Sequence, residues 1–187
     1  WKKLLFFLVL LTVLVPPQVI ITPSFLTFRT LGLVNNPLAF YLPALLGSGL
    51  KGGLFIFIFR HFFRGLPKEL EEAAAIDGCG FMHCFLRIVI PNAGAVFLMA
   101  VILSFIWYWN DYYMGSMYMR NVNTVTLALE RLPAASQSMT GDIAYDPFKV
   151  VTLMQAGSLL TIVPPLLAYL FLQRKFVQGV QRSGIVG

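Results

Sequence analysis

Four long apolar stretches constrain this fold more than any other feature of the sequence. Three of them contain no charged residue, and one contains a single lysine, Lys51. A helix needs about 20 apolar residues to cross the hydrocarbon core of a bilayer, so each stretch is long enough for one crossing. The sequence therefore predicts an all-α, polytopic transmembrane helix bundle in which residues 1–187 form one domain. The predicted spans are residues 4–28, 40–59, 88–109 and 150–172.

The composition agrees with a chain that lies in lipid. It is 58% hydrophobic and only 12% charged, whereas average soluble domains carry about 25% charged residues. The formal net charge is +6. In a membrane protein a basic excess is typical of cytoplasmic loops, so we expect membrane lipid and no nucleic acid around this chain.

The distribution of lysine and arginine predicts how the spans are oriented. Nine of these residues fall on one side of the predicted bundle and four on the other, and the richer side is the cytoplasmic one. Both ends of the chain and the 60–87 loop are then cytoplasmic, and the 110–149 loop lies outside. The nine are Lys2, Lys3, Arg60, Arg64, Lys68, Arg87, Arg174, Lys175 and Arg182, and the four are Arg29, Arg120, Arg131 and Lys149.

Pairs of consecutive prolines lie inside two predicted spans, Pro16-Pro17 in the first and Pro164-Pro165 in the fourth. Each pair removes backbone donors, so we expect it to kink or break its helix. The freed carbonyls need partners in lipid. A kinked helix that lines a path through the bundle and a static kink in a packed bundle both meet this need.

Lys51 is the one charge inside a predicted span. A lysine near the bilayer centre costs about 2.5–3.5 kcal/mol on insertion scales, so its side chain is expected to face the bundle interior, a cavity or a partner chain. One hypothesis is that Lys51 lines a path through the bundle or its gate, and the other is that it makes a structural contact. The surrounding glycines favour close helix packing and stand at positions 47, 49, 52 and 53.

A short acidic helix is predicted inside the 60–87 loop. Pro67 suits the first turn, the acids that follow suit the positive end of the helix dipole, and Gly78 can end the helix with a positive φ. The alanines between them give one face little bulk. Because this segment is acidic, it is ill suited to anionic headgroups, and we expect it to dock on another protein.

The spacing around this helix resembles a known motif. Glu72-Ala73-Ala74, three residues, Gly78, nine residues, Ile88, one residue, Ile90 and Pro91 match the EAA loop of bacterial ABC-importer permeases, except for Ile90 where leucine is usual. The wider chain is similar to the carbohydrate-type, maltose-transporter-like branch of these binding-protein-dependent type I importers. That likeness lies in "FRHFFRGLPKELEEAAAIDG", "SFIWYWNDYY" and "FLQRKFVQGVQRSGIVG".

The resemblance implies that the 66–91 segment is a coupling element that docks on a separate ATPase. Permeases of this kind usually have six spans, so this chain would hold the last four. The residues that would form the docking site, or coupling helix, are Glu69, Glu72, Ala73, Ala74, Asp77, Gly78, Ile88 and Pro91.

The resemblance also implies partners and a location. The chain would be a multi-pass protein of the bacterial plasma (inner) membrane, with its C-terminus cytoplasmic, and would not be an enzyme. Its partners would be a cytoplasmic ABC ATPase dimer, a second permease subunit and an extracytoplasmic sugar-binding protein. The chain would hold no cofactor, with ATP bound by the partner subunit, because "GSGLKGG" at 47–53 lacks the Gly-Lys-Ser/Thr of a phosphate loop.

Two further groups of residues complete the sequence-based predictions. Trp109, Asn110 and Asp111 join Lys51 as candidates for the translocation path, since aromatic faces stack on sugars, although the interfacial aromatic belt is the favoured alternative. The cysteines and histidines match no zinc spacing, so no metal site is predicted. An ATPase-independent channel or secondary carrier is the alternative function, but it has no reason to carry the EAA spacing.

Overall fold

The computed structural model describes residues 1–49, 51–67, 69, 72, 76, 78–140 and 146–184. All regular structure within these residues is helical, which confirms the predicted all-α class. The chain forms two compact units. The first comprises Trp1–Leu14, Lys51–Leu103 and Phe171–Gly187, and the second comprises Val15–Leu50 and Ser104–Leu170.

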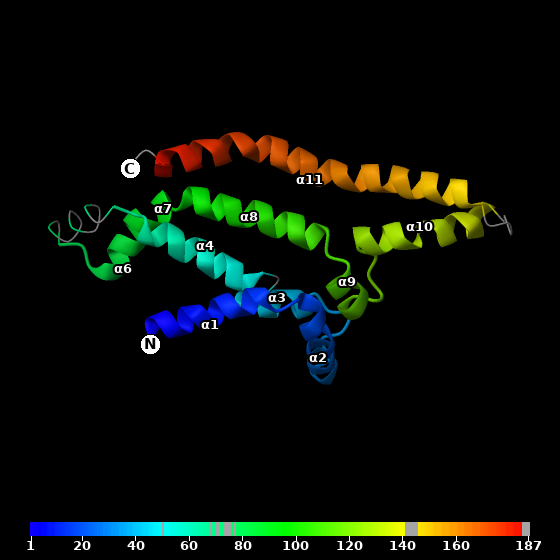
Figure 1. The fold of residues 1–187 in the computed structure, drawn as a ribbon, viewed down its shortest axis with the longest axis horizontal. Helices are drawn as coiled ribbons and strands as arrows, with labels where there is room; N and C mark the ends of the chain where they lie inside the picture. Colours follow the sequence, from blue (N-terminus) through cyan, green and yellow to red (C-terminus); the bar gives the residue numbers. More distant parts are fainter. Residues whose placement is uncertain are drawn as a thin grey trace. The chain divides into compact units, whose positions relative to one another are not determined.

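The first unit is built around two helices that approach closely, α1 (Lys2–Leu14) and α4 (Gly52–Arg64) (Figure 1). A Cβ placed on Gly53 would lie 2.6 Å from Thr12 Oγ1 and 3.0 Å from the Val9 carbonyl oxygen. Only a glycine fits at this separation, so close packing by a small residue is confirmed at this position. The guanidinium of Arg60 lies 3.5 Å from the centre of the Phe6 ring and adds a cation–π contact between the helices.

After α4 the first unit continues through a series of short turns into a longer apolar helix. The turns are α6 (Phe81–Cys84), a π-helical turn η1 (Phe85–Val89) and α7 (Ile90–Asn92), and the helix is α8 (Gly94–Trp109). The backbone N–H of Ile90 donates to the Phe85 carbonyl, a bond across five residues that widens the turn. Pro91 explains the widening, because its ring would clash with a carbonyl four residues earlier in a regular α-helix.

The second unit contains α2 (Pro17–Thr30), α3 (Leu38–Leu45), α9 (Tyr113–Tyr118), α10 (Val125–Thr140) and most of α11 (Pro147–Gly184). Its small core centres on Tyr118, whose exposed fraction is 3%. The Tyr118 ring lies 5.1 Å from Phe28 and 6.0 Å from Phe40, and its hydroxyl donates to the Ile21 carbonyl at 3.3 Å. Asn35, at a φ of 61°, donates its N–H to the Tyr118 carbonyl and ties the loop after α2 to α9.

The predicted first and second spans are both interrupted in the structure. The first breaks between Leu14 and Pro17, as the proline pair predicts. The second is not the continuous helix expected over 40–59: α3 ends at Leu45, and α4 starts only at Gly52. The physical reason is a stretch of non-helical backbone in which Gly47 has a φ of 73° and Lys51 a φ of 60°.

The third and fourth predicted spans differ from each other. The third is bent by 64° between Phe81–Asn92 and Gly94–Trp109. The fourth is one helix that passes through Pro164 and Pro165, so the expected break there is absent. By length and composition one described helix could cross a membrane, over Pro147–Gln173, or up to three if each bent pair is one span.

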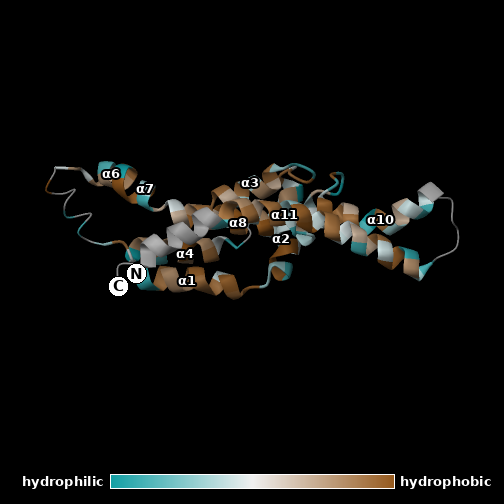
Figure 2. Cartoon of the chain, turned by 90° about the horizontal axis from the view of Figure 1, so that it is seen from above, coloured by the Kyte–Doolittle hydropathy of each residue, from teal (hydrophilic) through white to brown (hydrophobic). Residues whose placement is uncertain are grey.

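Apolar side chains dominate the outside of these helices. Figure 2 shows α1 and α8 coloured as hydrophobic over most of their length, while α10 has hydrophilic turns. On α11 the exposed fraction is 68% for Leu159, 74% for Leu160 and 78% for Phe171. Such surfaces are stable only against lipid or protein, which agrees with a membrane chain.

Candidate functional site

The predicted docking segment, residues 66–91, joins α4 to α8. Of its acidic residues, Glu69 and Glu72 are described, and both are helical and exposed. Ala73, Ala74 and Asp77 lie outside the described residues. The segment therefore exposes at least two carboxylates.

Gly78 has the backbone conformation that the sequence predicts. Its φ is 73°, which L side chains rarely adopt, so glycine is the residue that takes this turn with least strain. A Cβ added to Gly78 would meet no atom within 4 Å. The space beside this residue is open, and a partner's backbone can approach it closely.

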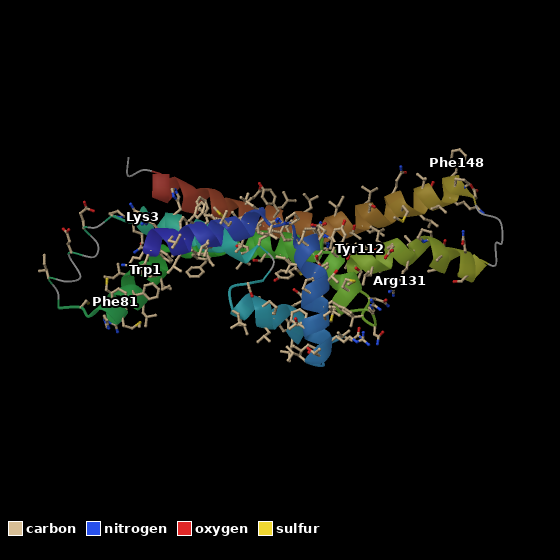
Figure 3. All side chains as sticks on the ribbon, turned by 60° about the horizontal axis from the view of Figure 1, so that its bottom comes forward. Trp1, Lys3, Phe81, Tyr112, Arg131 and Phe148 are labelled. Carbon is tan, nitrogen blue, oxygen red and sulfur yellow. The ribbon has the colours of Figure 1, made fainter. Side chains whose placement is uncertain are left out.

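Exposed apolar residues lie on both sides of Gly78. Ile76 belongs to the predicted acidic helix, where it is an expected apolar anchor. Phe81, Met82 and Leu86 follow Gly78 and are not among the predicted site residues. The exposed fractions are 86% for Ile76, 85% for Phe81, 62% for Met82 and 58% for Leu86. Figure 3 shows the labelled Phe81 on α6, at one end of its unit. We call Ile76, Phe81, Met82 and Leu86 the apolar docking face. The last three of these residues follow the helix stop at Gly78, and the sequence could have shown them as an apolar group. They come just before a predicted span, however, and are easily assigned to that span.

Ile88 and Pro91 lie in the widened turn and the short helix that follow. Ile88 belongs to η1 and is half-buried, and its carbonyl accepts a hydrogen bond from Asn92 Nδ2 at 2.8 Å. Pro91 is an exposed residue of α7. Single π-turns of this kind occur often at functional sites.

Lys51 lies in the break before α4 rather than within a helix. Its side chain is exposed. Lys51 is the N-cap residue of α4, and its backbone φ is 60°. Its carbonyl accepts hydrogen bonds from the N–H groups of Leu54 and Phe55, at 3.0 and 3.2 Å. Irregular backbone at membrane depth is tolerated where it is buried in protein or lines a water-filled cavity. The role of Lys51 in a translocation path stays a prediction.

Trp109 and Asn110, at the end of α8, each donate a side-chain hydrogen bond to a backbone carbonyl. The indole Nε1–H of Trp109 donates to the Thr161 carbonyl of α11 at 3.0 Å, and the ring lies 5.5 Å from Phe105. Asn110 Nδ2 donates to the Ile106 carbonyl at 2.8 Å. These bonds fix the end of α8, and the predicted role of both residues in translocation is not tested by them.

Asp111 organises the turn between α8 and α9. Its Oδ2 accepts from the Gly115 N–H at 3.0 Å and its Oδ1 from the Met114 N–H at 3.5 Å. Its carbonyl oxygen accepts from Thr126 Oγ1 at 2.8 Å. Burial raises the pKa of the Asp111 carboxyl, and the two backbone hydrogen bonds oppose that rise. The carboxylate thus acts as a helix cap in this structure.

Comparison with known proteins assigns the chain to a family. Residues 1–181 match the family model described as "Binding-protein-dependent transport system inner membrane component". The chain therefore belongs to this family of integral inner membrane components of transport systems.

The relatives are permease proteins. The chain is 31% identical over 186 residues to the arabinooligosaccharides transport system permease protein AraQ of Halalkalibacterium halodurans, covering 100% of this chain and 62% of that protein. It is 32% identical over 184 residues to the sn-glycerol-3-phosphate transport system permease protein UgpE of Pectobacterium atrosepticum, covering 97% of this chain and 60% of that protein. It is 30% identical over 182 residues to the lactose transport system permease protein LacG of Rhizobium radiobacter, covering 97% of this chain and 62% of that protein. The chain thus spans about three fifths of the length of the curated relatives it matches.

Proposed function

We propose that this chain is a permease subunit of an ATP-driven sugar importer. It forms half of a translocation path and couples to a separate ATPase through residues 66–91. The observation that carries the proposal is the docking segment: the EAA-type spacing contains the apolar docking face, whose four members are all more than half exposed. An ATPase-independent channel or carrier has no use for such a segment.

The chemistry of the segment supports a protein partner. Glu69 and Glu72 are exposed carboxylates that can pair with basic groups, and Ile76 and Phe81 are exposed apolar anchors nearby in sequence. An interface core needs apolar anchors surrounded by polar groups, and this segment supplies both. The open space beside Gly78 allows the partner's backbone to come near.

Sugars are the proposed cargo because of the names of the relatives. AraQ and LacG are named for arabinooligosaccharides and lactose, and UgpE for sn-glycerol-3-phosphate. The two sugars present rings on which aromatic faces can stack, and all three substrates carry hydroxyl groups to which amide and carboxylate side chains can hydrogen-bond. Trp109, Asn110, Asp111 and Lys51 remain the proposed contributors to the path.

The proposed assembly has further members. A second permease subunit would cover part of the exposed apolar surface of this chain and complete the path. A dimer of cytoplasmic ATPases would bind ATP and receive the docking segments. An extracytoplasmic sugar-binding protein would deliver the cargo to the side opposite the ATPases, with the C-terminus of this chain in the cytoplasm.

Co-purification with the ABC ATPases of the same organism tests the proposal. The full-length permease would be compared with a Glu72→Lys/Gly78→Asp double variant. We expect the unmodified chain to retain an ATPase and the variant to lose most of it, because the change reverses one charge and fills the space beside Gly78.

A Gly78→Asn variant is the matched control for backbone conformation. Asparagine adopts a positive φ more readily than most residues, so this variant keeps the turn while adding a side chain. If Gly78→Asn and the double variant both retain the ATPase as well as the unmodified chain, docking through this segment is wrong.

A further inference from the structure

Aromatic rings join α4 to the helices that follow the docking segment. Phe63 of α4 lies 6.4 Å from Phe85 of η1, ring centre to ring centre, with the ring planes at 55°. Phe59 of α4 lies 5.0 Å from Phe97 of α8, at 58°. Tilted ring pairs at this separation attract each other, and they contribute more free energy than the apolar area that they bury would give alone. All four rings belong to the first unit.

The two pairs lie on either side of a bend. Phe85 begins the π-turn, and Phe97 lies beyond Ala93, where the chain bends by 64° between Phe81–Asn92 and Gly94–Trp109. Phe59 and Phe63 are one helical turn apart on α4, and their rings stack at 6.0 Å. Helix α4 therefore contacts the bent pair of helices both before and after the bend.

The bend contains a π-turn and a proline, two features at which helices bend sharply. If the 66–91 segment moves when ATPases close, an unsupported bend would absorb part of the displacement before it reached α8. Ring contacts on both sides of the bend oppose this loss of displacement, because any change in the bend angle must separate at least one of the two ring pairs.

We infer that Phe63 and Phe85 form a brace that transmits movement of the docking segment to α8. They are positioning residues, since they act through the helices and not on the cargo. This inference rests on the proposed function, because it concerns what happens once an ATPase is bound. It assigns to Phe85 a role distinct from that of the apolar docking face.

The test uses the full-length permease assembled with its ATPases in nanodiscs. Cys79 and Cys84 are first replaced by serine. A reporter cysteine is then placed at Val101 of α8, whose exposed fraction is 60%, or at Ile56 of α4, whose exposed fraction is 42%. Each reporter cysteine carries a nitroxide spin label, which reports from lipid as well as from water, and the measured quantity is the change in its electron paramagnetic resonance spectrum when MgATP and vanadate are added.

We expect nucleotide to change the spectra of both reporters in the chain that keeps Phe63 and Phe85. Phe63→Leu or Phe85→Leu should reduce the response at Val101→Cys by about two- to tenfold, while the bound ATPase stays the same. The Phe63→Leu/Phe85→Leu double variant should reduce the response at Val101→Cys no more than either single variant does, because both changes remove the same ring contact. Phe85→Tyr keeps a ring and should keep the response.

Phe57→Leu is the control on the same helix. Its ring contacts Phe6 at 6.3 Å and His61 at 6.1 Å rather than η1, so the response at α8 should be unchanged. The inference is overturned if nucleotide changes neither reporter in the chain that keeps Phe63 and Phe85, or if Phe57→Leu lowers the α8 response as much as Phe63→Leu. Loss of the ATPase from the unmodified chain would instead contradict the proposed function.

Discussion

Phe81 offers a quantitative test of the docking surface. With an exposed fraction of 85%, its ring is almost wholly available to a partner. Full burial of a phenylalanine side chain contributes about 1.5–3 kcal/mol. Phe81→Ser should therefore weaken ATPase binding by about 10- to 100-fold if the ring is fully covered in the complex.

The chain provides a matched control for this substitution. Phe148, near the start of α11, also has an exposed fraction of 85%, and the sequence places it in the predicted outer loop. Figure 3 labels both side chains, Phe81 on α6 and Phe148 on α11. Phe148→Ser makes the same chemical change at equal exposure and should leave ATPase affinity unaltered.

The assay is a titration of purified ATPase against the full-length permease in nanodiscs, read as a dissociation constant. Detergent is avoided because it would cover the same apolar ring. Equal weakening by Phe81→Ser and Phe148→Ser would refute the reasoning, since the effect would then come from general loss of apolar surface. Unchanged affinity in Phe81→Ser would show that the apolar docking face is not part of the interface.

Further predictions concern packing, charge and pH. Gly53→Val should destabilise the first unit by about 1–3 kcal/mol in unfolding measurements, because its Cβ would lie 3.0 Å from the Val9 carbonyl oxygen. Gly94→Val is the control and should change the stability little, because no atom lies within 4 Å of a Cβ at that position. If Lys51 acts through its charge, Lys51→Asn should abolish transport, although asparagine tolerates the φ of 60° at this position. Lys51→Arg keeps the charge and should preserve transport. Equal uptake by the unmodified chain and both variants would remove Lys51 from the path. Because burial raises the folded-state pKa of Asp111 above its ordinary 3.8, the folded chain binds more protons than the unfolded one, so stability should fall as pH rises from about 3.8 through that raised pKa. Asp111→Asn should flatten this part of a thermal-stability profile, and an unchanged slope would mean that another group titrates.

The sequence predicts best where a residue type has one physical use. Gly78 follows a run of helix formers, and only glycine readily takes the positive φ that ends such a helix, so its conformation could be predicted. The helical class follows equally from the apolar runs, since isolated strands leave backbone groups unpaired in lipid. The break at Pro16 and Pro17 was likewise predictable from the missing backbone donors.

Prediction fails where several conformations suit the same residues. Lys51 lies among apolar residues and glycines that also fit a continuous helix, so hydropathy concealed the break before α4. Pro164 and Pro165 suggested an interruption, yet their fixed φ fits a helix, and the flanking turns keep their own hydrogen bonds in α11. Ring contacts such as that between Phe63 and Phe85 depend on how helices cross and cannot be read from spacing alone.

The close approach at Gly53 has a consequence for how this chain tolerates change. A second glycine behaves similarly: a Cβ on Gly157 would lie 2.6 Å from Leu129 Cδ1. Large apolar side chains such as Leu160 are, by contrast, mostly exposed and can be exchanged for others of similar hydropathy. A complete substitution scan should therefore reverse the pattern of a water-soluble domain, with the glycines at helix contacts among the least replaceable residues and the exposed bulky ones more readily interchangeable.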